Sequence, residues 1–213
     1  MGMKKGGNIT AADIWQWFDE HNIDLMLSAD SKDEAFDMLM QELNELVNGY
    51  CSGLHAKVMT TTGGDIMLII TAFGNEEYFE DAEALVAEAP LVEGWEIRAL
   101  KPPINREIHC AIDDVELNSE DVWFESLDTN EEPFKMGIRL YVKGYDVTPN
   151  KESLKKLMLV ILQEMAGEKA FALDIGRIEG VYLPDKPEQL DLRPIIELPG
   201  YLSNYFQKLT LLN

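Results

Sequence analysis

The sequence predicts an α/β protein with a mixed α+β sheet, built from two ββαβ half-repeats that follow N-terminal helices. Amphipathic helical runs alternate along the chain with short apolar runs rich in β-branched residues, which is the pattern of helices interleaved with strands. The order strand, strand, helix, strand also occurs twice. In that order, "GWEIRALKPP" of the first half occupies the same place as "IGRIEGVYLPD" of the second, which indicates an internal pseudo-repeat.

Chain length and the candidate linker determine the domain organisation that we expect. A chain of 213 residues has room for one large domain or two small ones. The first half-repeat covers about residues 31–104, the second about 105–199, and a C-terminal tail covers 200–213. The candidate linker, "KPPINREIHCAIDD", contains the strand-like run "REIHCAI". We therefore expect a single composite domain over residues 1–213, or two tightly packed lobes, in preference to domains on a flexible tether.

The run "TAADIWQWFDEHN" predicts the first helix. Thr10 is the expected N-cap, and apolar side chains recur behind it at helical spacing. The predicted face consists of Ile14, Trp17, Phe18 and His21. We place His21 in the last turn, where a cationic side chain favours the helix dipole.

The run "SKDEAFDMLMQELNELVNGY" predicts a second helix. Ser31 and Glu34 have capping-box spacing, and Asn48 and Gly49 are typical of a helix end. The apolar stripe consists of Phe36, Leu39, Leu43 and Leu46. Such a stripe indicates a helix that lies on the body of the protein.

The first half-repeat begins with a predicted β-hairpin that turns at Gly63-Gly64, because paired glycines supply the positive φ of a tight turn. Its second strand, residues 66–72, is nearly all apolar, so we expect it at the centre of the sheet. Asn75 is the expected cap of the next helix, which Pro90 closes. The run "GWEIRAL" then returns as a strand, which makes a parallel crossover unit.

The second half-repeat follows the same order. "DVWFESLD" and "FKMGIRLYVKGY" predict two strands joined by an acidic turn with Asn130 and Pro133. Thr148-Pro149 suits the start of a helix, and Gly167 its end. "FALDIGRIEGVYLP" is the predicted returning strand, and the apolar, proline-broken tail is expected to pack back on the body.

Charge is the strongest global property of the chain. Its formal net charge is −21, from 39 acidic and 18 basic residues. Such a surface repels phosphate backbones and anionic membranes, so we expect no nucleic-acid or membrane partner. It favours a basic protein partner. No apolar signal segment or span of about 18 apolar residues occurs, and a cytoplasmic location is expected.

Catalytic and metal-binding patterns are missing from the sequence. There is no nucleophile elbow, metalloprotease helix, phosphate-binding loop or dinucleotide fingerprint. Cys51 and Cys110 lie far apart, and His109 and Cys110 are strand neighbours that point to opposite faces. The acidic run at Asp113, Asp114 and Glu116 is interpreted as a solvated turn. We therefore name no catalytic residue, metal ligand or cofactor.

One turn has a local geometry that many α/β proteins use for ligands. Gly74-Asn75 precedes a helix N-terminus, which attracts anions, but Glu76 and Glu77 already complement that helix dipole. Trp95 is interpreted as a core anchor at the start of its strand. These residues therefore indicate a scaffold more than a site.

Several phrases resemble a widespread set of uncharacterised bacterial proteins that carry a domain of unknown function. They are "GNEEYFEDAEALVAEAP", "GWEIRALKPP", "DVWFES", "AGEKAFALDIGRIEGVYLP" and "LRPIIELP", in this order over about residues 66–199. The family phrase has Leu where Ala166 stands here. The resemblance implies a bacterial cytosolic α/β protein, and a looser fold-level similarity to acidic inhibitors of ribonuclease E implies a protein-binding role.

Two functions are expected from these observations. The first is a non-enzymatic acidic binding or regulatory protein, such as an inhibitor or immunity-like partner of a basic protein. The alternative is a small-ligand-binding protein or enzyme with its site in a cleft between the half-repeats. The candidate ligand or partner contacts are Asn75, Arg98, Lys101, Glu168 and Arg193.

Overall fold

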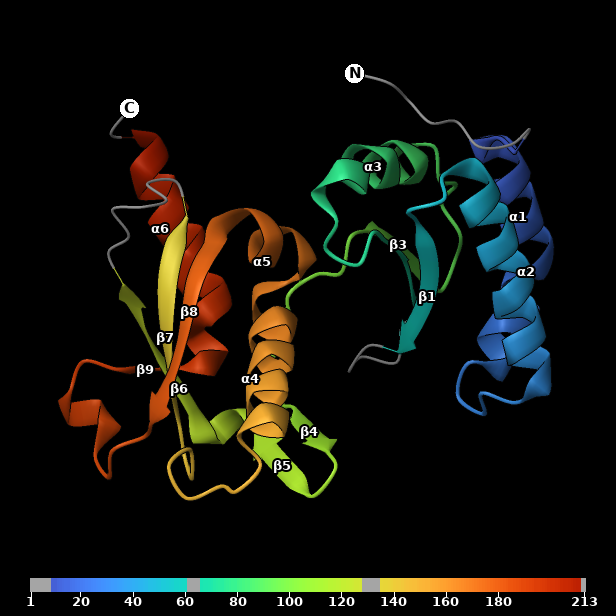
Figure 1. Cartoon of the computed structure of the whole chain (residues 1–213). Coiled ribbons are helices and arrows are strands. Elements are labelled where there is room, and N and C mark those ends of the chain that lie inside the picture. The colour runs from blue at the N-terminus through green and yellow to red at the C-terminus, as the bar shows by residue number, and fades with distance from the viewer. Residues whose placement is uncertain (1–8, 61–65, 128–134, 212–213) are drawn as a thin grey trace. The chain divides into compact units, whose positions relative to one another are not determined.

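The computed structural model describes residues 9–60, 66–127 and 135–211 (Figure 1). The chain divides into two compact units, Met1–Lys101 and Pro102–Asn213. Both units combine helices with a sheet of mixed strand direction, which confirms the predicted fold class of an α/β protein with mixed α+β sheets.

The first unit places two helices before a three-stranded sheet. Its elements are α1 (Ala11–Ser28), α2 (Glu34–Tyr50), β1 (His55–Thr60), β2 (Ile66–Thr71), the 3₁₀ helix η1 (Glu76–Tyr78), α3 (Phe79–Ala87) and β3 (Trp95–Ala99). Strand β1 pairs antiparallel with β2, and β2 pairs parallel with β3. The predicted hairpin, central strand and parallel crossover are therefore confirmed. The Gly63-Gly64 turn lies outside the described residues.

The core of the first unit forms around β2. Leu68, Ile69 and Ile70 are each at most 1% exposed, and because neighbouring strand residues point to opposite faces, both faces of β2 are covered. Helix α1 reaches β3, where the buried Phe18 ring meets the Trp95 ring edge-on at 5.0 Å.

Helix α1 corrects two predictions. It continues to Ser28, so His21 lies in its middle and not in a last turn. The helix continues because its buried apolar face extends past His21 to Leu25, which has no exposed surface. The aromatic residue on its buried face is also different: Trp15 is buried and Trp17 is half-buried.

Helix α2 has a different cap and end from those predicted. Asp33, not Ser31, is the N-cap, and its carboxylate accepts the backbone N–H of Phe36 at 3.1 Å. Ser31 donates to that carboxylate at 2.9 Å and so supports the cap indirectly. The helix ends at Tyr50, beyond Asn48 and Gly49.

The second unit contains a hairpin, a four-stranded sheet and three α-helices among its described residues. Its strands and α-helices are β4 (His109–Ile112), β5 (Val115–Asn118), β6 (Val122–Leu127), β7 (Met136–Val142), α4 (Lys151–Ala166), α5 (Glu168–Asp174), β8 (Ile175–Tyr182), β9 (Arg193–Pro194) and α6 (Leu198–Leu211). Three 3₁₀ helices join them: η2 (Ser119–Asp121), η3 (Pro187–Gln189) and η4 (Ile195–Glu197).

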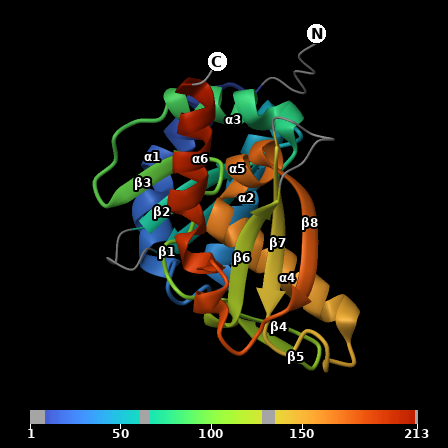
Figure 2. The same cartoon turned by 90° about the vertical axis from the view of Figure 1, so that its left-hand side faces the viewer.

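The larger sheet has the strand order β8-β7-β6-β9. Strand β7 pairs antiparallel with β6 and parallel with β8 (Figure 2). One face of the sheet meets the apolar side of α4, where Leu157, Ile161 and Leu162 are fully buried. Helix α6 adds Leu198 and Leu202 to the same core, which confirms that the tail packs back on its unit.

Three boundaries in the second unit differ from the predictions. Helix α4 begins at Lys151, because the Asn150 side chain caps it by accepting the Ser153 N–H at 3.2 Å; Thr148-Pro149 precedes that cap. The segment "FALD" belongs to helix α5, so the returning strand begins at Ile175. The predicted tail is largely helix α6, which starts before Gly200. The turn with Asn130 and Pro133 lies outside the described residues.

The two units share an order of elements. Each contains an antiparallel strand pair, then a helix, then a third strand parallel to the second. The second unit adds the β4–β5 hairpin, α5, β9 and α6. The half-repeats at about 31–104 and 105–199 stay a prediction, as does their origin by duplication.

Candidate functional site

The helices of the first unit carry acidic side chains and no basic ones. Helices α1, α2 and α3, with η1, contain thirteen Asp or Glu residues and no Lys or Arg. These acidic residues are Asp13, Asp19, Glu20, Asp24, Glu34, Asp37, Glu42, Glu45, Glu76, Glu77, Glu80, Asp81 and Glu83. All are exposed except Asp81, which is half-buried. We call this set the acidic helical surface.

Helix capping explains only part of the acidic helical surface. Acidic residues in a first turn complement the positive end of the helix dipole, and seven of the thirteen have such positions: Asp13, Glu34, Asp37, Glu76, Glu77, Glu80 and Asp81. Asp24 lies outside the first turn of α1, where the positive end of the dipole no longer stabilises a negative charge. Since capping does not account for such a residue, folding of the helix alone does not explain the charge.

An aromatic pair on α1 lies within this surface and makes one hydrogen bond to α2. The rings of Trp17 and His21 are stacked, with centroids 4.4 Å apart. The indole Nε1 of Trp17 donates to Glu42 Oε2 on α2 at 3.3 Å, and Nδ1 of His21 lies 2.8 Å from the Trp17 carbonyl oxygen. The hydrogen bond from Trp17 to Glu42 therefore links the two helices at their solvent side, and the contacts with His21 support the Trp17 ring from within α1.

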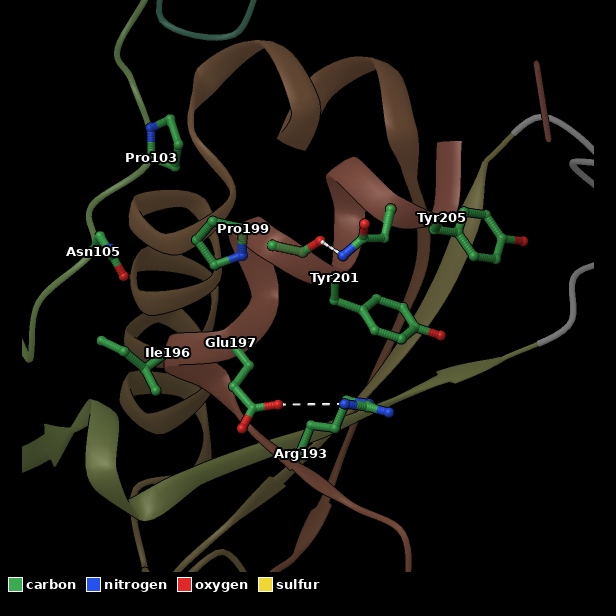
Figure 3. A pocket seen from close by; sticks show the side chains of 10 residues that line it. Pro103, Asn105, Arg193, Ile196, Glu197, Pro199, Tyr201 and Tyr205 are labelled. Carbon is green, nitrogen blue, oxygen red and sulfur yellow. Dashed lines mark hydrogen bonds and ion pairs between the residues drawn. The ribbon is translucent and has the colours of Figure 1, made fainter. Parts of the chain in front are cut away.

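The second unit contains an open pocket of about 830 Å³ (Figure 3). It lies beside η4 and the start of α6. The lining residues are Pro103, Asn105, Arg193, Ile196, Glu197, Pro199, Gly200, Tyr201, Asn204 and Tyr205. A pocket of this size suits a small ligand.

Arg193 is the cation of this pocket, and the pocket itself supplies its partners. Its Nη1 lies 3.4 Å from Glu197 Oε2, and its guanidinium lies 5.4 Å from the ring centroid of Tyr201. The Tyr201 hydroxyl is 2.8 Å from Ser126 Oγ. A ligand with a carboxylate would therefore compete with Glu197 for the guanidinium of Arg193.

The predicted contact residues divide between the two units. Asn75, Arg98 and Lys101 belong to the first unit, and Glu168 and Arg193 to the second. Asn75 accepts the backbone N–H of Glu77 at 3.1 Å, so it caps η1 as expected. Arg98 Nε donates to Glu96 at 2.6 Å. Among these contacts, Arg193 alone lines the pocket of the second unit.

Two of these residues have structural positions. Lys101 is half-buried and follows Leu100, whose N–H donates to the Ile70 carbonyl at 2.8 Å and so extends the parallel pairing of β2 and β3. Glu168 is 3% exposed and begins α5, where its carboxylate lies in the first turn. Glu168 is therefore too buried to present its carboxylate to a large partner.

The histidines and cysteines have separate surroundings. His55 packs against the Phe73 ring at 4.8 Å, and exposed His109 lies 2.8 Å from Asn118 Oδ1. Burial raises the pKa of the Cys51 thiol, with a smaller contribution from nearby Asp81, so it stays protonated near neutral pH. Within the parts of the chain that the structure describes, no three His, Cys, Asp or Glu side chains are grouped as metal ligands would be.

The acidic run after β4 is exposed to solvent, and one of its residues also has a structural role. Asp113, Asp114 and Glu116 are exposed, as expected of a solvated turn. Asp113 also accepts the Ser153 hydroxyl at 2.6 Å. This hydrogen bond joins the β4–β5 turn to the first turn of α4.

A polar network on β6, β7 and β8 was not predicted. Arg139 contacts Glu125 on one side and Glu179 on the other, at 2.6 and 2.8 Å, and Tyr141 donates to Glu125 at 2.8 Å. Burial raises the pKa of the Tyr141 hydroxyl, with help from Glu125. The signal that predicts such a network is the alternation of polar and apolar residues along "MGIRLYV", but it does not identify the partners on other strands.

The comparisons leave the family open. No protein-family model, curated protein or solved structure matches the chain. The resemblance to the bacterial family with a domain of unknown function therefore stays a prediction. Among residues 9–60, 66–127 and 135–211, no helix is both long enough and apolar enough to cross a bilayer. The structure thus defines an α+β protein with an acidic helical surface and a separate pocket.

Proposed function

We propose that this protein is a non-enzymatic, cytoplasmic binding or regulatory protein whose partner is a basic protein. The observation that carries the proposal is the acidic helical surface, with thirteen carboxylates and no Lys or Arg in its helices. An inhibitor or immunity-like role fits, because a surface of one charge sign can cover the basic surface of another protein.

Electrostatic steering gives this surface a physical advantage. Complementary charges raise the rate of association, and the gain falls as salt screens the field. The same carboxylates repel nucleic-acid phosphates and anionic lipids. The proposed partner is therefore a protein with a basic patch, and neither nucleic acid nor a membrane is a partner.

The test is retention of partners from a lysate of the native host on the immobilised protein. We expect basic proteins at low salt, their loss at about 0.5 M salt, and their loss from a variant with four amide substitutions in the acidic helical surface. The substitutions are Asp19→Asn, Glu20→Gln, Asp24→Asn and Glu45→Gln, and all four side chains are exposed.

A matched control changes the same number of charges in the second unit. Its substitutions are Asp114→Asn, Glu120→Gln, Asp185→Asn and Glu188→Gln, also at exposed positions. This variant should retain the partners. Failure of the unchanged protein to retain any partner at low salt would contradict the proposal, as would equal loss in the two variants.

A second candidate function is binding of a small ligand in the pocket of the second unit. The pocket of about 830 Å³ with Arg193 beside Tyr201 favours it. This pocket lies within the second unit, so it is a different site from the predicted cleft between the half-repeats. That cleft stays a prediction. A thermal-shift screen of aromatic carboxylates tests it: a ligand should raise the Tm of the protein, and Arg193→Gln should remove that rise.

A further inference from the structure

Helix α1 exposes two aliphatic side chains within the acidic helical surface. Ile23 is 66% exposed and Leu27 is 77% exposed. They are four residues apart, so they are neighbours on one side of the helix. Single exposed aliphatic residues are ordinary on protein surfaces, but a pair one turn apart is a continuous apolar contact area.

The core of the first unit makes no use of this side of α1. The residues that α1 buries include Ile14, Phe18 and Leu25, each with no exposed surface. Ile23 and Leu27 share the opposite side with Glu20, which is also exposed. Folding therefore gains little from either aliphatic side chain, and both are accessible to another molecule.

Charge surrounds this apolar pair. Glu20 and Asp24 are on the same side of the helix as Ile23 and Leu27, and all four are exposed. We call these four residues the α1 face. Met38 on α2, the helix that packs beside α1, is 56% exposed as well (Figure 1). The apolar area thus lies among carboxylates with no cation on either helix.

We propose that the α1 face docks a basic amphipathic helix of the partner, with aliphatic residues one turn apart and Lys or Arg beside them. The proposal rests on the proposed function and specifies the partner's contact. Charge complementarity selects this occupant: the aliphatic residues would pack on Ile23 and Leu27 while the cations meet Glu20 and Asp24. A second copy of this chain is a poor occupant, because its own carboxylates would face these.

The test uses two synthetic helical peptides of about 18 residues, long enough to form a helix. One contains Leu and Lys with leucines on one side, and the other replaces each Leu with Ala at the same charge. Binding is measured by fluorescence anisotropy at low and high salt. We expect the Leu/Lys peptide to bind at least about tenfold more tightly than the Ala/Lys peptide, because apolar burial adds to charge attraction.

Two variants locate the contact. The double variant Ile23→Ser, Leu27→Ser should weaken the Leu/Lys peptide about tenfold and leave the Ala/Lys peptide unchanged. The matched control is Leu91→Ser, at another fully exposed position of the same unit, and it should bind both peptides as the unchanged protein does. Circular dichroism and Tm should be the same for all three proteins, since the substituted side chains are exposed.

The outcomes separate the two proposals. If both peptides bind equally in a salt-dependent manner, or if the double variant binds as the Leu91→Ser control does, the α1 face is not the docking site while the proposed function stands. If neither peptide binds at low salt, the docking proposal fails. The proposed function fails by its own test, when the immobilised protein retains no basic partner.

Discussion

Arg139 and Glu179 form an ion pair across the parallel strands β7 and β8, with Arg139 Nε 2.8 Å from Glu179 Oε2. The two residues are directly opposite each other in the strand pairing. This is the position where a cross-strand pair of opposite charge stabilises a sheet. The pair also links stability to pH, because one partner titrates in acid.

The first prediction concerns acid stability. The Arg139 hydrogen bond is the main cause that lowers the pKa of Glu179 below its usual value. A lowered folded-state pKa gives stability that is present above the unfolded pKa and is lost as pH falls through the folded pKa. Glu179→Gln should therefore lower Tm near neutral pH and have little effect in strong acid. Thermal unfolding across pH 2–8 checks this; a difference in Tm that does not change with pH would contradict it.

The second prediction compares two buried indole groups. Trp15 Nε1 donates to the Leu85 carbonyl at 3.0 Å, whereas Trp95 Nε1 is buried with no hydrogen-bond partner. Trp15→Phe should cost about 1 kcal/mol more in the free energy of unfolding than Trp95→Phe, because only the first substitution removes a hydrogen bond. Urea unfolding of both variants measures this, and equal losses would refute the comparison.

The third prediction concerns Gly167, which ends α4 with a φ of 77°. A Cβ there would lie 2.7 Å from the backbone nitrogen of Pro103, so Gly167→Ala combines backbone strain with a collision. We expect a loss of more than about 2 kcal/mol in the free energy of unfolding. Gly74 is the control: it has a φ of 79° but open space around it, so Gly74→Ala should cost about 1 kcal/mol. Similar losses would show that the approach of Pro103 is unimportant.

The fourth prediction tests the N-cap of α2. Asp33 accepts the Phe36 N–H, which lowers the pKa of the Asp33 carboxyl together with the weaker Ser31 hydrogen bond. Asp33→Ala should lower Tm more than Ser31→Ala, since only the first leaves a helix N–H without its acceptor. If Ser31→Ala has the larger effect, the cap assignment is wrong.

Local patterns predicted the parts of the fold that depend on neighbouring residues. The apolar run at 66–72 predicted a central strand, and β2 is central. The start signal at Thr148-Pro149 and the end signal at Gly167 predicted α4 to within a few residues. Such signals are strong because periodicity reports directly which face of an element is buried.

Features that depend on distant residues were not predictable in this way. The segment "FALD" is short and apolar, which suits a strand or a helix equally, and only the structure shows that it continues as α5 after Gly167. The two-residue strand β9 exists because Arg193 and Pro194 pair with β6. Of the candidate contacts, Arg193 lines a pocket, whereas Glu168 is buried. The charge of a residue does not predict which of these positions it takes, because tertiary packing decides which side chains are buried.

The acidic helical surface also affects the stability of its own unit. Like charges on neighbouring helices repel one another in the folded state, and the repulsion weakens when ions screen it. A cationic partner would act as a counterion. Its positive charges would weaken the repulsion between the carboxylates of α1 and α2, and they would also be attracted to those carboxylates. Part of the binding free energy would then come from reduced repulsion inside this protein, between two helices that the exposed hydrogen bond from Trp17 to Glu42 links at their solvent side.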